Sequence, residues 1–478
     1  MEDQGLAVAR MRFLSSDEEE FAHEKTLEVL GEIGVLVRSD SVLSLLDDAG
    51  ANIDKRRHVA KIPEEMVVEA LKTAPSEFEL SARLRANDIK LPSDSEPRLT
   101  TDGLTLYMND LETGERRNAT KRDFAEFAIL ADALDSVDFF WPIVTISDVP
   151  AESHNIHELW TAFQNCTLHV QGDCMSAVDA RTMIELASLV VGGRDELKKR
   201  PVFSCAIDPI SPLSFDKGAA EAQVELARAG IPVLCHSMSM SGISAPVTLA
   251  GTVINLNAEN LASLVISQCA SRGSPHIYGS CSAPADMMTG GINLCAPEAM
   301  LISAAAGQMA ARYGRPCMVA NWGMGWKGPG IWLSLSEAFA YASSAFSGSD
   351  LISGIGGLDH AKGCSMEQMV LDSIVWTDFR AFLKKFAFDQ RSAALDTMKD
   401  VGHGNSFLSH AHTARTFRKE LQFWKESDLE FERTLSDAML PDTRKIAKRM
   451  LKEHVPLQIE EEIVKSGNLV LKEHDRRN

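Results

Sequence analysis

From residue 139 onward, short apolar runs alternate with helix-length stretches whose apolar residues recur at helical spacing. The runs are bounded by turn residues, as is typical of buried strands. Their centres recur at roughly 27–44 residues, the length of a strand, a helix and two loops. Several of the helical stretches end in glycine shortly before the next run, which is expected at a helix C-terminus. The predicted strands lie within 139–147, 167–173, 201–208, 231–239, 275–283, 316–324 and 350–359.

Seven βα units in succession predict an α/β fold, a (β/α)8 TIM barrel with additional N-terminal helices and hairpin and C-terminal helices. The eighth strand lies either in the 95–110 region or near residue 400. A doubly wound open sheet is the competing topology, and it usually carries a glycine-rich phosphate turn after its first strand. No GxGxxG follows either of the first two runs.

The pattern divides the chain into three parts. Residues 1–120 predict an N-terminal helical and hairpin extension, residues 121–400 the barrel catalytic domain, and residues 401–478 a C-terminal helical extension. Ser16 is expected to cap the first helix, with Glu19 as its capping-box partner. Asp-Gly and Thr-Gly turn signals predict a β-hairpin between residues 98 and 120, followed by a helix over 121–133.

Charge and cysteine usage exclude several classes of protein. The chain of 478 residues has a formal net charge of −19, which argues against binding to nucleic acid or to an anionic membrane. We find no apolar run long enough to span a membrane, and the acidic N-terminus is unlike a signal peptide. The nine cysteines include no CxxC pair and are expected to be reduced, buried thiols. A cytoplasmic location is therefore expected.

In a barrel, function lies at the C-terminal ends of the strands. No P-loop and no nucleophile elbow is present there. His236, Cys235, Cys205 and Cys281 could converge, but without metal-ligand spacing they are expected to line the core or a pocket, and no metal is predicted. The polar and aromatic residues near the ends of the predicted strands are Asp148, Gln171, Asp173, Asp208, His236, Ser237, Tyr278, Ser280, Asn321, Trp322, Asp359 and His360.

Residues 320–332, "ANWGMGWKGPGIW", gather three tryptophans among glycines and a proline. Such a stretch leaves the sixth predicted strand as a loop, and aromatic faces at a barrel mouth attract cations, quaternary ammonium groups above all. Ordinary packing is the alternative for each ring. The expected cage residues are Trp322, Trp326, Trp332, Tyr107 and Tyr278. Asp102, Asp359, His360 and the glycines at 354, 356 and 357 are candidates to orient a ligand, although each could equally belong to a turn.

Several segments are similar to the trimethylamine methyltransferase superfamily. They include "SGISAPVTLAGTVINLNAENLASLVISQCASRGSPHIYGS", "APEAMLISAAAGQMAARYGRP", "DLISGIGGLDHAKGCSMEQMVLD", "VGHGNSFLSHAHTARTFRKE" and the N-terminal "LEVLGEIGVLV", in the family's order. The resemblance implies a barrel that moves a methyl group from a methylated amine to a corrinoid protein. No pyrrolysine is present, so the chain resembles the non-pyrrolysine branch, which includes glycine betaine methyltransferase. Where many relatives have a polar stretch after the sixth strand, this chain has "NWGMGWKGPGIWLSLSEA".

The resemblance and the predicted cage together suggest a quaternary amine as the methyl donor. Its leaving group is a neutral tertiary amine, so no general acid is required and the protein must chiefly bind, orient and exclude water. The corrinoid is expected on a separate protein, because Asp359-His360 lacks the D-x-H-x-x-G spacing of corrinoid carriers. The expected catalytic residues are Asp102 and His360. The expected substrate-binding residues are Tyr107, Tyr278, Asn321, Trp322, Trp326, Trp332, Gly356 and Gly357.

Four functions remain open from the sequence. Glycine betaine is the leading methyl donor, with Lys327, Asn321 and His360 as candidate donors to its carboxylate. Proline betaine or carnitine in the same reaction is a second possibility, and a non-catalytic cytoplasmic quaternary-amine binding protein is a third. An unrelated barrel lyase would need a clear acid–base pair, which we do not find. A homo-oligomer is expected in each case.

Overall fold

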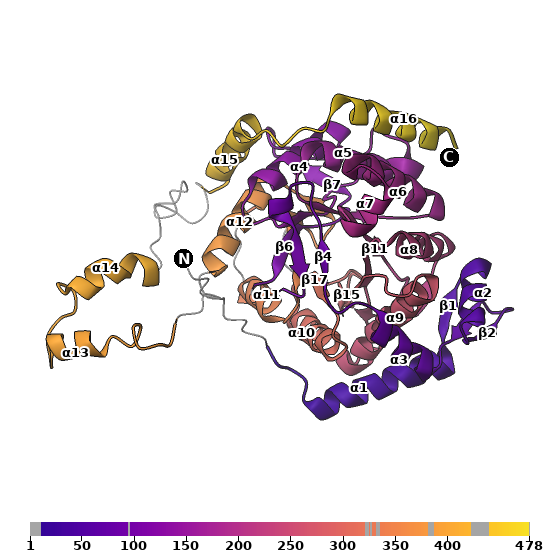
Figure 1. Ribbon diagram of the computed structural model, residues 1–478, viewed down its shortest axis with the longest axis horizontal. Coiled ribbons are helices and arrows are strands. Elements are labelled where there is room, and N and C mark those ends of the chain that lie inside the picture. The colour runs from indigo at the N-terminus through magenta and orange to yellow at the C-terminus, as the bar shows by residue number, and fades with distance from the viewer. Residues whose placement is uncertain are drawn as a thin grey trace.

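Eight parallel strands close into a barrel at the centre of the protein (Figure 1). The computed structural model describes residues 11–93, 96–320, 325, 327–330, 335–380, 387–421 and 439–477. The strands follow one another around the barrel in sequence order, which confirms the predicted fold class. They are β6 (Arg98–Thr101), β9 (Phe139–Phe140), β10 (His169–Asp173), β11 (Phe203–Ile207), β13 (Val233–Ser237), β15 (His276–Ser280), β17 (Cys317–Ala320) and β18 (Leu351–Ile355).

A helix follows each barrel strand and covers its outer face (Figure 1). Helix α9 is long and apolar enough to cross a membrane, and among the described residues it is the one helix that meets this test, but 78% of its apolar window is buried within the protein. The eight helices are α4 (Lys121–Ala133), α5 (His154–Asn165), α6 (Ala177–Val191), α8 (Lys217–Ala229), α9 (Leu249–Ala270), α10 (Pro297–Arg312), α11 (Leu335–Phe346) and α12 (Met366–Arg380). The short α7 (Arg194–Lys199) follows α6.

The eighth strand is β6, which lies inside the segment predicted as an N-terminal extension. It pairs in parallel with β18 on one side and β9 on the other, so the barrel begins near residue 98 rather than at residue 121. The turn signals after it belong to a shorter hairpin of β7 (Tyr107–Asn109) and β8 (Arg116–Arg117). Because β6 has only four residues and three of them are polar, it lacks the apolar run that marked the other seven strands.

The N-terminal segment wraps one side of the barrel with short elements. Ser15, not Ser16, caps the first helix: its side chain accepts the backbone N–H of Glu18, whose side chain bonds back to the Ser15 N–H. The prediction was one residue late because two serines precede four consecutive acidic residues, so both registers satisfy the pattern. The elements are α1 (Ser16–Glu28), a π turn (Val29–Ile33), β1 (Val35–Val37), α2 (Asp40–Asp48), β2 (Asn52–Asp54), β3 (Val59–Lys61), α3 (Glu64–Thr73), β4 (Phe78–Leu80) and β5 (Ile89–Leu91), with β12 (Ser214–Phe215) joining the sheet of β1, β2 and β3.

The hairpin of β4 and β5 closes the N-terminal end of the barrel. Leu80, Ile89 and Leu91 pack in one apolar cluster with inward side chains of the barrel strands, among them Phe139 and Ile277. The barrel interior is therefore filled at its N-terminal end, and a site is expected at the C-terminal ends of the strands.

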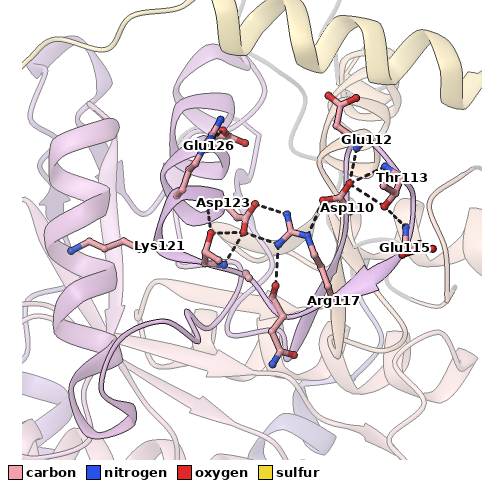
Figure 2. A network of polar contacts seen from close by, with 12 residues as sticks. Asp110, Glu112, Thr113, Glu115, Arg117, Lys121, Asp123 and Glu126 are labelled. Carbon is pink, nitrogen blue, oxygen red and sulfur yellow. Dashed lines mark hydrogen bonds and ion pairs between the residues drawn. The ribbon is translucent and has the colours of Figure 1, made fainter.

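Loops at that open end form two small sheets. One joins β7 and β8 to β19 (Gly357–Leu358) and β20 (Gly363–Cys364), and the other pairs β14 (Met240–Ser241) with β16 (Ala283–Pro284). Arg117 fastens the first sheet to α4: its Nε donates to Asp110 Oδ2 at 2.8 Å, and Nη1 and Nη2 donate to the two carboxylate oxygens of Asp123 at 2.7 and 2.6 Å (Figure 2). Such bidentate pairs fix orientation, so the hairpin is held firmly beside the mouth.

The C-terminal segment is helical but divided. Helices α15 (Met439–Glu453) and α16 (Glu461–Arg477) return to the barrel, where Arg444 of α15 pairs with the buried Glu367 of α12 at 3.0 Å. Helices α13 (Leu395–Val401) and α14 (Ala411–Glu420) stand apart from the barrel (Figure 1). Neither of these two helices has a buried residue.

Candidate active site at the barrel mouth

The alternation of side chains along the strands decides which residues face the barrel interior. Ala206 and Leu234 lie in the interior cluster, whereas their neighbours Cys205 and Val233 pack against the helices. Two positions further on, the same inward face ends in Asp208, directly after β11, and in His236 on β13. The inward residues at the mouth are thereby Asp102, Trp141, Asp173, Asp208, His236 and Cys281.

Asp102 follows β6 directly and is 96% buried, since its exposed fraction is 4%. Its Oδ1 accepts the N–H of Gly103 at 2.9 Å, while its buried Oδ2 has no hydrogen-bond partner in the part of the chain that the structure describes. Gly357 lies directly behind it, because a Cβ there would come within 2.4 Å of Oδ2. Burial raises the pKa of Asp102 to about 7, although the Gly103 N–H and the charge of His236 act against this. The carboxyl group is therefore poised between its neutral and ionised forms.

Trp141 follows β9 and forms a rigid aromatic wall of the mouth. Its indole Nε1–H donates to Asp173 Oδ2 at 2.7 Å, which fixes the ring, and Gly103 leaves room for the ring's face. The other carboxyl oxygen of Asp173, Oδ1, is buried without a partner. Burial, reinforced by the neighbouring carboxylate of Asp208, raises the pKa of Asp173 well above its ordinary value.

His236, on β13, lies against Trp141 and extends this wall. Its ring lies edge-on to Trp141 with centroids 5.1 Å apart, and its Nδ1 lies 3.4 Å from Asp208 Oδ1. Burial opposes the charged imidazolium, but the neighbouring Asp208 and Cys281 outweigh it and raise the pKa of His236 to about 10. Its buried Nε2 has no hydrogen-bond partner among the residues that the structure describes. The imidazolium therefore balances one of the carboxylates of the mouth.

The sum of these groups favours a cationic ligand. Three carboxyl groups, those of Asp102, Asp173 and Asp208, face one imidazolium, and two of the three carboxyls have a buried oxygen without a partner. Unsatisfied buried acceptors and raised carboxyl pKa values both show that the ionised forms of Asp102 and Asp173 lack a stabilising charge in the free protein. A cation against the Trp141 face would supply it without needing a hydrogen-bond donor.

The structure places some predicted residues at this site and others elsewhere. Asp102 lines the mouth, and Gly357 supports it from behind. Gly356, with φ at 81°, donates its N–H to Asp372 Oδ2 at 2.8 Å, which anchors the turn to α12. These glycines shape the wall through their backbone, as expected of residues that allow close approach.

Two predicted cage residues do not present a free face to the mouth. Tyr278 has the wrong parity on β15: its side chain points into the helical layer, where its OH donates to Asn257 at 3.0 Å. Tyr107 belongs to the β7 sheet, its OH donates to Asp359 Oδ2 at 3.1 Å, and the Arg116 guanidinium already lies 3.3 Å above its ring. Neither tyrosine is therefore part of the candidate cation site.

His360 lies on a strained turn at the rim of the mouth. Asp359, His360 and Ala361 have φ values of 51°, 55° and 64°, three successive left-handed residues that are unusual without glycine. Ala361 packs with Cys281 and Ala320 of the mouth, and His360 Nδ1 is buried without a partner. Burial, followed by the charge of Lys362, lowers the pKa of His360, so its imidazole is neutral.

The predicted residues Asn321, Trp322, Trp326 and Trp332 lie outside the described residues. Lys327, within the same stretch, is exposed. Gly330 donates its N–H to Gln368 Oε1 of α12 at 2.9 Å, which ties this part of the chain to the barrel.

The sequence reasoning missed Trp141 as a wall of the mouth and left Asp173, Asp208 and His236 as unassigned residues at strand ends. The signal for Trp141 was its place at the end of the "FFW" strand, two positions after the inward Phe139. Within the described ranges, no group of three His, Cys, Asp or Glu residues is arranged to hold a metal ion.

A closed-bottom (β/α)8 barrel with an acidic, aromatic mouth describes the class of protein. The family model for trimethylamine methyltransferase (MTTB) matches residues 5–456, and this chain belongs to that family, on its non-pyrrolysine side. It is 33% identical over 408 residues to the trimethylamine methyltransferase MttB of Desulfitobacterium hafniense (strain DSM 10664 / DCB-2), covering 85% of this chain and 82% of the relative. It is 27% identical over 441 residues to the glycine betaine methyltransferase of Desulfitobacterium hafniense (strain Y51), covering 92% and 89%.

Solved structures agree on the architecture. The monomethylamine methyltransferase MtmB of Methanosarcina barkeri superimposes with a TM-score of 0.56 at 12% identity, covering 93% of this chain and 89% of that one. At this identity the likeness concerns the fold alone. Membership of the family makes the protein a methyltransferase, and the barrel mouth is where its chemistry is expected.

Proposed function

We propose that the protein moves a methyl group from a quaternary amine to the corrinoid of a partner protein. The observation that carries this proposal is the mouth itself, where the Trp141 indole stands among three carboxyl groups and a single imidazolium. The relatives named for trimethylamine and glycine betaine support a methylated amine as the donor.

The residues of the mouth would bind and orient the donor. Asp173 holds the Trp141 ring in place, so its face is preorganised for a methylated cation. Asp102, without a partner on Oδ2, attracts the positive charge once ionised. These attractions stabilise the bound amine more than the neutral leaving group, so rate must come from aiming one methyl group outward and excluding water.

The corrinoid supplies the nucleophile that receives the methyl group when the partner is bound. Because a tertiary amine leaves without needing a proton, the chain needs no general acid here. Asp102 and His360 remain our proposed catalytic residues, Asp102 as the charge that holds the cation and His360 as a neutral group at the rim.

The rim of the mouth suits a docking protein. Large apolar side chains are exposed on loops that follow the barrel strands, and Met287 and Met288 are 73% and 96% exposed. Exposed methionines adapt to a partner surface, and contiguous apolar exposure marks interaction sites. The other exposed apolar residues of these loops are Leu106, Met175, Ile210, Met238, Ile243 and Val247.

For the particular amine, glycine betaine has the support of the relative that is 27% identical, and proline betaine and carnitine remain alternatives. A cytoplasmic protein that binds a quaternary amine without turnover would use the same mouth. Turnover separates this second function from the first.

The test is methyl transfer to free cob(I)alamin with a panel of quaternary amines, followed by the absorbance of methylcobalamin. We expect methylcobalamin with at least one amine, and a large loss of rate in Trp141→Ala. Trp160→Phe, in the helical layer, is the matched control. If an amine binds but no methylcobalamin forms, the protein is a quaternary-amine binding protein. If no amine binds and no methyl group is transferred, the proposal is rejected.

We also propose a homo-oligomer. Leu395, Met398 and Leu408 on or beside α13 and α14 are exposed on a segment that stands apart from the barrel, which supports contact with another copy of the chain. Light scattering should give a smaller particle for a Leu395→Ser, Leu408→Ser variant than for the wild type. An unchanged particle mass would exclude this segment as the contact.

A further inference from the structure

The charges of the mouth distinguish two kinds of quaternary amine. A betaine carries a carboxylate beside its trimethylammonium group, whereas choline carries a hydroxyl group at the same place. Both present the same methylated cation to Trp141, so the rest of the mouth must discriminate between them. The described groups there offer many acceptors and few donors.

The acceptors converge on the interior from two strands, β6 and β10. Asp102 Oδ2, Asp173 Oδ1 and Gln171 Oε1 are buried and have no hydrogen-bond partner among the described residues. Gln171 is completely buried and lies one inward position below Asp173 on β10, so it lines the floor beneath the carboxyl groups. An amide oxygen without a donor indicates, independently of the acids, that a ligand group with a hydrogen to donate fits here.

Among the described residues, positive charge near these acceptors comes from His236, with Lys327 and Lys362 further out beside His360. His236 is the cation that faces Asp102 and Asp173, and its Nδ1 is occupied by Asp208. Lys327 is exposed. Its charge acts on His360 at the rim, where it helps to lower the pKa of that imidazole. At pH 8 a ligand carboxylate in this mouth would therefore meet the ionised Asp102, with the one remaining N–H of His236 as its charged donor.

The titratable groups around Asp102 and Asp173 come from several strands and helices of the barrel. Glu158 of α5 and Asp208 add negative charge near Asp173, and Asp372 of α12 adds it near Asp102. Those at the mouth and rim are Asp102, Asp173, Asp208, His236, Cys281, Glu158, Asp372, Asp286, Lys327, Asp359, His360 and Lys362.

We propose that this mouth selects a quaternary amine that carries no carboxylate, of which choline is the model compound. The inference rests on the proposed transfer from a quaternary amine, and within that class it disfavours glycine betaine, proline betaine and carnitine, which all carry a carboxylate. The trimethylammonium group lies against Trp141 beside Asp102 and Asp173. The hydroxyl group donates to Gln171 Oε1 or an unpartnered carboxyl oxygen and accepts from His236 Nε2. Glycine betaine brings a second negative charge to the same atoms.

The test compares choline and glycine betaine by calorimetric titration at pH 6 and pH 8. We expect choline to bind at least about tenfold more tightly than glycine betaine at pH 8. Choline affinity should rise from pH 6 to pH 8 as Asp102 ionises, and betaine affinity should not rise. The wild-type protein alone gives this result, so it does not depend on the folding of a variant.

Variants locate the effect. Asp102→Asn should weaken choline about tenfold and flatten its pH dependence, while glycine betaine binding stays the same or improves. Asp396→Asn on the exposed α13 is the matched control and should change nothing. Lys327→Ala should leave choline binding unchanged.

Two results would reject this inference while leaving the proposed function valid. If glycine betaine binds as tightly as choline, or if Lys327→Ala removes a betaine preference, the mouth recognises a carboxylate and the selection is wrong. If no quaternary amine binds at either pH, the proposed function fails and the inference fails with it.

Discussion

The two ends of the barrel are built from the same eight strands but have opposite chemistry. At the N-terminal end, the β4–β5 hairpin fills the interior with Leu80, Ile89 and Leu91 against Phe139. At the C-terminal end, two residues further along the same inward face, Trp141 stands among carboxyl groups with unpartnered oxygens. The closed end is built for stability, and the open end keeps polar groups that folding alone would not favour.

The largest expected effect breaks the closed end. Leu80→Ala or Leu91→Ala removes a buried side chain of the β4–β5 hairpin. Each should lower the free energy of unfolding by about 3 kcal/mol, because a cavity remains in a packed interior. Urea unfolding measures this. Amine affinity per folded molecule should stay unchanged. A parallel loss of affinity would mean that the β4–β5 hairpin also shapes the ligand site.

At the open end, Trp141→Ala should weaken binding of a quaternary amine by about 2 kcal/mol, roughly thirtyfold, because the cation loses a desolvated aromatic face. Trp141→Phe should lose less. Calorimetric titration provides the measurement, with Trp160→Phe as control. Equal affinity in Trp141→Ala and the wild type would exclude Trp141 as the cation wall.

The charge of the open end should reduce stability as pH rises. Because burial raises the pKa of Asp102 to about 7, the folded protein holds a proton there between about pH 4 and pH 7 that the unfolded chain releases. Stability from this group is thus greatest in acid and is lost as pH rises through 7.

Asp102→Asn should consequently raise the free energy of unfolding at pH 8 by about 2 kcal/mol and by much less at pH 5. Urea unfolding at the two pH values checks this. A variant less stable than the wild type at pH 8 would show that the carboxylate is satisfied in the folded state.

The smallest effect concerns a residue that lies between the two ends but on the outer face. Tyr278→Phe removes the hydrogen bond to Asn257 and should lower the free energy of unfolding by about 1 kcal/mol. Amine affinity should not change. A loss of amine affinity with unchanged stability would show that Tyr278 contributes to the ligand site.

Much of the fold could be predicted because apolar runs and helical spacing repeat along the chain. The predicted helix over 121–133 matches α4, and all seven predicted strands are found in the barrel. The eighth strand, β6, was ambiguous because Arg98–Thr101 carries little apolar character and is buried by its neighbours rather than by its own pattern. Tertiary contacts decide such a strand.

The site could be predicted only in part. Asp102 was a candidate because it begins an Asp-Gly pair, and the structure places it at the mouth. Tyr278 points away from the mouth because its side-chain direction depends on where β15 begins. Asp173 and His236 were located at strand ends, yet nothing in the sequence shows that the former fixes Trp141 or that the latter pairs with Asp208. These roles arise from contacts between neighbouring strands of the closed barrel.

Titration of tetramethylammonium into the wild type and into an Asp102→Asn, Asp173→Asn variant at pH 8 tests most directly whether the acidic, aromatic mouth is a cation site. We predict saturable binding to the wild type and affinity at least about tenfold weaker in the variant, whose neutral side chains keep the shape of the mouth. Equal affinity in the two proteins, or no binding to the wild type, would contradict the central claim.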